Sequence, residues 1–351
     1  MRPVVGESSK AERTDAASVT AQMPVIDEFA AFDPNAGGPQ DPNPPDEGPP
    51  ERPSHPDRPS RPDRPSRPDR FDDVSPAEVT APLILPAAVN HLGGAIAAGA
   101  VAIGLAVASK FGVTPLLIGV ALTQGLLVVS WVVGTELPGR VGGLVVGALA
   151  AAGADFVVSR WPHGQAGALL GVLALAVPVM FIHQLTRGVV RTRVVESLSD
   201  IAVLVVGVVA LAALMQLRHE TVGALMVSAL VLAAGGALVA GHVVDAVAPV
   251  MRFDAKVPRG LPAVIVGAAV GAAATYFRLR NTVEFDGHRS LYLGAAVGAI
   301  VSLFAVGTAF IEHNLRLAGR WPTIVRPVAT AVLSFALLIP VGYLLCLQIR
   351  G

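Results

Sequence analysis

The sequence has 351 residues, of which 53% are hydrophobic and only 15% are charged, yet it also contains 28 prolines. Its formal net charge is zero, but residues 1–91 hold 9 Lys and Arg against 16 Asp and Glu, whereas residues 92–351 hold 17 against 10. This asymmetry excludes one uniform globular domain, and the lack of a basic stripe with aromatic residues excludes a nucleic-acid binder.

Residues 1–80 are predicted to form a disordered tail rich in Pro, Asp and Arg. It contains the six-residue repeats PSHPDR at 53–58 and PSRPDR at 59–64 and 65–70. Such a segment buries too little apolar surface to offset the entropy lost on ordering. The tail acts either as a spacer or as a binding segment for a protein partner. Its first residues lack an apolar run, so we expect no cleavable signal peptide.

The body, residues 81–351, is predicted to be an all-α polytopic membrane bundle. Nine apolar segments have the length that a bilayer requires, and only a helical bundle satisfies their backbone in lipid. Repeated small residues, as in VGAAVGAAA, favour close helix contacts. The predicted spans are 92–109, 113–134, 141–159, 165–182, 199–217, 221–248, 260–277, 290–311 and 324–348.

The positive charges predict the orientation of these spans. With the tail inside, the inner loops hold ten Lys and Arg residues and the outer side holds seven. This bias predicts a cytoplasmic N-terminus in a plasma or inner membrane, and an external C-terminus. The loop after the fourth span gives the firmest cytoplasmic prediction, and its arginines either fix the topology or bind lipid phosphate groups. They are Arg187, Arg191 and Arg193.

The sixth predicted span contains the strongest candidate site. His242 and Asp245 are three residues apart and therefore share one helix face. A carboxylate at membrane depth needs a partner or a function, and Pro249 leaves the carbonyl of Asp245 without its helical donor. We interpret the pair as a proton or cation site, as part of a phosphate-processing centre, or as a packing contact with an arginine. The loop that follows adds Arg252, Lys256 and Arg259 as candidate ligands for phosphate.

The other polar residues give weaker signals. Asp155 lies five residues before Arg160, and we expect it to reach the membrane interface or that arginine. Cys346, the single cysteine, is expected in the core. No H-E-x-x-H, G-K-[ST] or G-x-S-x-G motif occurs, so the sequence predicts no metal site, no cofactor and no catalytic residue.

The layout of the body resembles the phosphatidate cytidylyltransferases, membrane enzymes that make CDP-diacylglycerol from CTP and phosphatidic acid. The segments that carry the resemblance are RGLPAVIVGAAVGA after the span with Asp245, GAIVSLFAVGTAFIEHNLRLAG, and the closing LLIPVGYLL. Glu312 and Arg316 match the family's G-D-x-x-E-S-x-x-K-R motif, whereas Thr308 stands in place of its metal-binding Asp. The resemblance therefore implies an inactive relative, with Mg²⁺ as cofactor only if activity remains.

Three functions follow from the sequence. The first is a divergent, inactive cytidylyltransferase relative that binds anionic lipid headgroups through its basic loops. The second is a small-solute or proton-coupled transporter in which Asp245 titrates. The third is a membrane scaffold that recruits a protein through its tail.

Overall fold

The computed structural model describes residues 84–135, 137, 139–161, 167–187, 194–247, 260–283, 285–314 and 325–350. Side chains are described from residue 91 onward, except at 312–314 and 350. The chain divides into two compact units, Met1–Asp69 and Arg70–Gly351, and all described residues belong to the second. The predicted tail, with its repeats at 53–70, lies outside the described residues.

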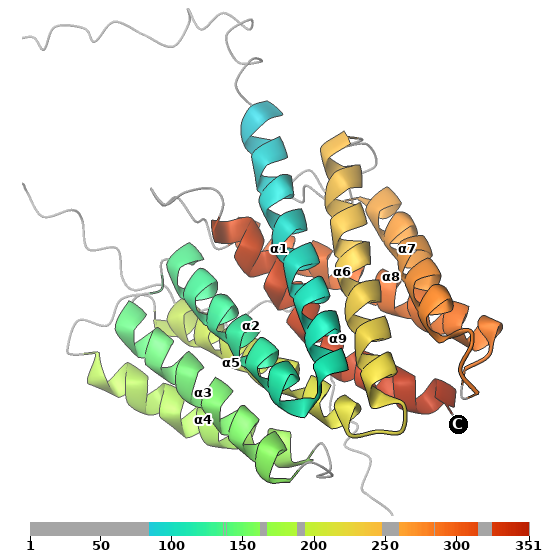
Figure 1. Ribbon diagram of the computed structural model, residues 1–351. Coiled ribbons are helices and arrows are strands. Elements are labelled where there is room, and N and C mark those ends of the chain that lie inside the picture. The colour runs from blue at the N-terminus through green and yellow to red at the C-terminus, as the bar shows by residue number, and fades with distance from the viewer. Residues whose placement is uncertain are drawn as a thin grey trace, which may run out of the picture. The chain divides into compact units, whose positions relative to one another are not determined.

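Nine helices make up the described part of the chain, and each is long and apolar enough to cross a bilayer (Figure 1). This confirms the prediction of a polytopic helical membrane bundle. The helices are α1 (Ile84–Phe111), α2 (Val113–Gly134), α3 (Arg140–Arg160), α4 (Gly167–Thr186), α5 (Val194–Arg218), α6 (Gly223–Val247), α7 (Leu261–Leu279), α8 (Gly287–Asn314) and α9 (Val325–Arg350).

Several helices begin before their predicted spans. Helix α1 begins at Ile84, eight residues before its predicted span. Helix α8 begins at Gly287 because the Asp286 carboxylate accepts a hydrogen bond from the backbone N–H of Arg289 at 2.6 Å. This is an N-cap, which lets the helix start outside the apolar segment.

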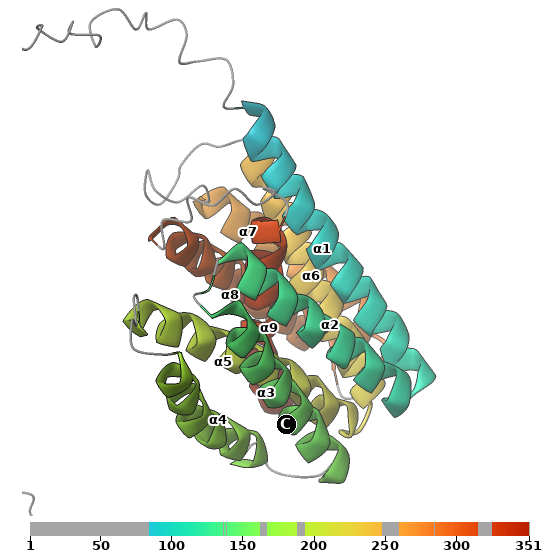
Figure 2. The ribbon, with the colours of Figure 1, turned by 90° about the vertical axis from the view of Figure 1, so that its left-hand side faces the viewer.

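Helices α5, α6 and α9 form the interior of the bundle. In their most apolar segments 72%, 67% and 61% of the residues are buried, compared with 22% in α4 and α7. Helix α9 contacts α1, α2, α5, α6 and α8. It therefore joins α2–α5 to α1 and α6–α8 (Figures 1 and 2).

Helices α7 and α8 pack with their backbones in contact. A Cβ added at Gly271 would overlap the carbonyl oxygen of Gly294, and one at Gly298 would overlap that of Gly267. The Thr275 hydroxyl donates a hydrogen bond to the Ser290 carbonyl across this contact at 2.6 Å. Small residues at intervals of four are a common basis of tight helix packing in membranes.

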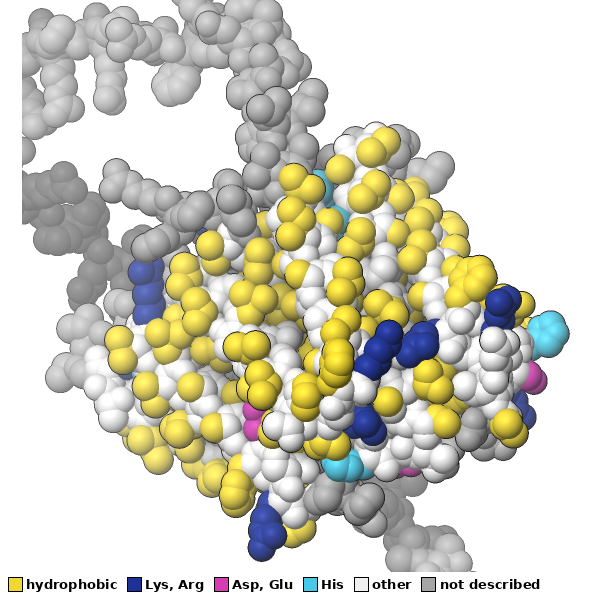
Figure 3. Space-filling view, viewed as in Figure 1, with side chains coloured by type: hydrophobic (Ala, Val, Ile, Leu, Met, Phe, Trp, Pro, Cys, Tyr) yellow, Lys and Arg dark blue, Asp and Glu magenta, His cyan; other side chains and the backbone are white. Residues whose placement is uncertain are grey.

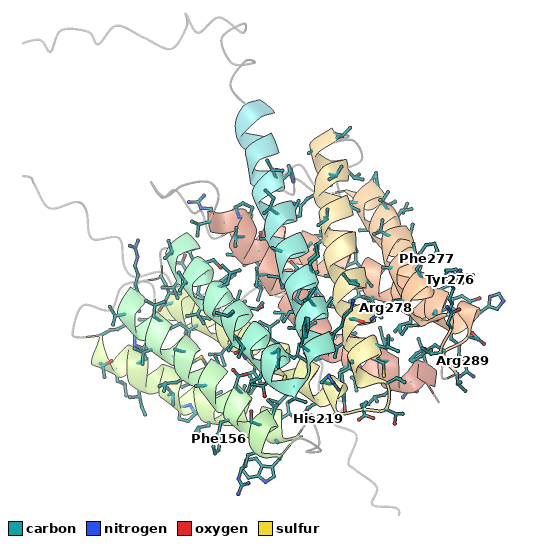
Figure 4. All side chains as sticks on the ribbon, viewed as in Figure 1. Phe156, His219, Tyr276, Phe277, Arg278 and Arg289 are labelled. Carbon is teal, nitrogen blue, oxygen red and sulfur yellow. The ribbon has the colours of Figure 1, made fainter. Side chains whose placement is uncertain are left out.

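The surface of the bundle shows where a membrane boundary lies. Hydrophobic side chains dominate the face of the bundle in Figure 3, and many of the charged side chains visible there lie near one edge. Tyr276 and Phe277, at the end of α7, pack edge to face and both lie beneath the guanidinium of Arg280, at 5.4 and 5.5 Å (Figure 4). Phe156 and Trp161 form a similar pair at the end of α3. Aromatic residues beside cations are typical of the interface between lipid and water.

Candidate functional site

The candidate site lies where the beginning of α1 meets the end of α6. The two helices run antiparallel, since Gly94 faces His242 while Ala102 faces Gly235. A Cβ added at Gly94 would overlap the His242 ring, and one at Gly235 would overlap the Ala102 side chain. The helices therefore touch through their small residues, and the ring of His242 occupies the space that a side chain at position 94 would fill.

Three titratable side chains gather at this contact. His242 is 3% exposed and Asp245 is 6% exposed, and their spacing of three residues places them on one face of α6. The half-buried ring of His91, from α1, lies edge to face with that of His242, with 5.8 Å between the ring centres and 62° between the planes. Two imidazoles thus meet between two helices, with a buried carboxylate on the same face of α6 as one of them.

The charges of this group are coupled to one another. Two imidazolium ions 5.8 Å apart repel by about 3 kcal/mol at an effective dielectric constant of about 20. One imidazolium beside the carboxylate of Asp245 is compensated, which reduces the cost of roughly 2.5–3.5 kcal/mol for a lone carboxylate at membrane depth. Histidine is the side chain that ordinarily changes charge between pH 5 and 8. The group therefore suits the uptake and release of single protons.

The structure brings together only part of the predicted site. His242 and Asp245 are both buried, and His242 faces α1. The basic residues predicted to complete the site after α6 lie outside the described residues, as do two of the three arginines that follow α4. These are Arg252, Lys256 and Arg259 after α6, and Arg191 and Arg193 after α4.

Arg187 is the one predicted headgroup ligand that the structure describes. It lies at the end of α4, where its guanidinium donates a hydrogen bond to the side-chain oxygen of Gln184 at 2.8 Å. The amide of Gln184 in turn donates to the hydroxyl of Ser197 on α5 at 3.1 Å. Arg187 thus belongs to a chain of hydrogen bonds between α4 and α5, whereas the histidine pair lies between α1 and α6.

The sequence did not single out His91 and Gly94. His91 stands just before the predicted first span, and nothing in the sequence indicates that α1 packs against α6, where His242 lies 151 residues after His91. The one available signal was the spacing of His91 and Gly94 at the start of an apolar run. Residues three apart in a helix lie on one face. That pattern gives no information about the facing residue.

The prediction for Asp155 is wrong as regards Arg160. Its carboxylate does not reach Arg160 but accepts a hydrogen bond from the side-chain amide of Gln124 at 3.1 Å. The same amide donates to the backbone carbonyl of Val208 at 3.0 Å, so that Gln124 links α2 to α3 and α5. The Cα–Cβ bond of a helical residue tilts toward the N-terminus, which turns Asp155 away from the end of α3 and toward the middle of the bundle.

In the described ranges, no three His, Cys, Asp or Glu side chains are arranged to hold a metal ion. His91, His242 and Asp245 thus form a group of titratable residues and not a metal-binding geometry. Cys346 is buried, as predicted.

The fold and this site define the class of the protein, which is an α-helical multi-pass membrane protein. No family model matches the chain, and no match was found among the curated proteins or the solved structures. The fold and the chemistry of the side chains therefore carry the functional argument.

Proposed function

We propose that this protein is a proton-coupled membrane carrier in which His91, His242 and Asp245 bind the proton. The observation that supports this proposal is the contact of the two imidazole rings within one helical turn of a buried carboxylate. Ionisable residues inside membrane bundles are expensive to bury and mark proton relays or ion pathways more often than not.

Because His242 lies in the contact between α1 and α6, its charge affects how the two helices pack. A glycine at position 94 lets the His242 ring enter the contact, so both helices bear directly on the titrating ring. Protonation changes the charge that this contact must accommodate, and so changes the relative stability of packed and separated helices. A two-state contact of this kind is what a carrier requires in order to couple a proton to movement.

Proton flux in proteoliposomes tests the proposal. The protein is reconstituted into vesicles that contain a trapped pH-sensitive dye, and a pH step is imposed. We expect the wild type to equilibrate the pH and Asp245→Asn to lose this flux, because asparagine cannot carry the negative charge that compensates a protonated ring.

Asp286→Asn is the matched control. Asp286 is an exposed acid that caps α8, and asparagine is an equally good capping residue, so its flux should equal that of the wild type. Equal flux in the wild type and Asp245→Asn, both above empty vesicles, would contradict the proposal, as would the absence of flux from the folded wild type.

The relationship to the cytidylyltransferases and the binding of lipid headgroups by the basic loops remain predictions. Most of the basic loop residues lie outside the described part. Turnover of CTP with phosphatidic acid and Mg²⁺ is the measurement that would establish an enzyme.

A further inference from the structure

A second polar contact lies in the α2, α3 and α5 part of the bundle. Gln124 is 1% exposed and stands at the middle of α2, and Val208 lies close to the middle of α5. Both hydrogens of the Gln124 amide are used, one by the Asp155 carboxylate at 3.1 Å and one by the Val208 carbonyl at 3.0 Å. Asp155 is thus joined through Gln124 to the middle of α2 and to α5.

The side-chain oxygen of Gln124 is the other polar atom of this amide. It is buried and has no hydrogen-bond donor among the described residues. Buried amide oxygens are nearly always bonded, so this acceptor calls for a donor. The Asp155 carboxyl already accepts from the nitrogen of that amide, and it becomes a donor when it is protonated.

The charges around Asp155 do not compensate an ionised carboxylate. Helix α2 carries no ionisable side chain, and the nearest on α3 is Arg160, five residues away and turned to a different face. The nearest on α5 is Asp200, eight residues or about 12 Å along the helix from Val208. Helix α4, which packs against α3, contributes only His183 near its far end. In the described residues no ion pair to Asp155 is formed, so a neutral acid suits this position better than an anion.

We infer that Asp155 and Gln124 form a proton-binding site between α3 and α2, in which Asp155 carries the proton and donates it in a hydrogen bond to the Gln124 oxygen. The carboxyl then accepts from the amide nitrogen and donates to the amide oxygen, so every polar atom of the pair is bonded. This site goes beyond the proposed function, because it lies in another helix group and does not depend on the histidine pair.

A lipid-soluble carbodiimide tests the inference without any transport assay. The reagent adds to a neutral carboxylic acid, with the acid proton moving to a reagent nitrogen and the carboxylate oxygen bonding to its central carbon. Asp155 is half-buried at the bundle surface, where a reagent dissolved in lipid reaches it. With the full chain in phosphatidylcholine vesicles at pH 7, peptide mass spectrometry should find the adduct at Asp155.

The same experiment includes two controls. The adduct should be lost in Asp155→Asn and should be absent from the exposed Asp286, which lies in water as an anion. A folded wild type without an adduct at Asp155 would overturn the inference. Protection of Asp155 by Na⁺ at constant pH would also overturn it, because the site would then hold a metal cation in place of a proton.

Stability gives an independent second measurement. Asparagine imitates the neutral acid, since its oxygen accepts from the Gln124 nitrogen and its NH₂ group donates to the Gln124 oxygen. Asp155→Asn should therefore keep the wild-type unfolding midpoint in detergent, whereas Asp155→Leu should lower it by leaving the Gln124 amide partly unbonded. An equal loss in both variants would show that the negative charge itself is needed and would refute the inference.

Discussion

Single glycines make room for histidine rings where two helices of this bundle meet. Gly94 in the first turns of α1 makes room for the ring of His242 near the end of α6, and Gly142 at the start of α3 makes room for the ring of His183 near the end of α4. In both pairs an added Cβ would overlap the imidazole. In both pairs, a glycine on one helix leaves the space that a histidine ring of the facing helix fills.

The first pair gives a prediction about stability. In Gly94→Ala the new methyl group overlaps the His242 ring, which must rotate or push α1 away from α6. Overpacking of this kind costs about 1–3 kcal/mol, so we expect a lower unfolding midpoint in detergent. Thermal unfolding followed by tryptophan fluorescence measures it.

Gly104→Ala is the control on the same helix. Nothing lies within 4 Å of a Cβ at this position, and alanine is the better helix former, so the midpoint should stay or rise. If the two alanine variants unfold at the same temperature, the close contact at Gly94 does not stabilise the fold.

At the scale of elements, the helix pairs are held by different interactions. Helices α7 and α8 approach through glycines until their backbones touch, and Thr275 adds one hydrogen bond to the carbonyl of Ser290. Helices α2, α3 and α5 are instead joined by the side chain of Gln124. A contact between backbones leaves no room for adjustment, whereas a side-chain bridge tolerates small movements of the helices.

Helices α7 and α8 should therefore be sensitive to a single methyl group. A Cβ at Gly271 meets the Gly294 carbonyl and lies 3.0 Å from the Cα of Gly298, and neither backbone atom is able to rotate away. We expect Gly271→Ala to destabilise the protein by about 3 kcal/mol, at the upper end of overpacking effects. Equilibrium unfolding in detergent measures this change. Gly307→Ala in α8, where the added atom meets nothing within 4 Å, should leave stability unchanged.

At the scale of the whole molecule, nine helices of the described part cross from one face to the other. An odd number of crossings places the beginning of α1 and the end of α9 on opposite sides of the membrane. Reporters inserted before α1 and after α9 should therefore respond to opposite compartments. Two reporters active on the same side would show that one of the nine helices does not span.

The spans were predictable because each is an apolar run of bilayer length, a property of the local sequence alone. The site was predictable only in its α6 half, since His242 and Asp245 share a face by their spacing. His91 came from a helix far away in the chain, and Arg160 was a wrong partner for Asp155, suggested only because the two residues lie close together in the sequence of α3. Its actual partner, Gln124, is 31 residues earlier, on a helix whose packing no local pattern specifies.

Helix α5 illustrates how the order of synthesis relates to the finished structure. It is enclosed on several sides, and its Gly207 fits between Leu127 of α2 and Leu333 of α9. Helices α2 and α5 are synthesised before α9. The side of α5 that α9 covers therefore stays open to lipid until α9 is made, and a nascent chain that stalls before residue 325 leaves that side exposed.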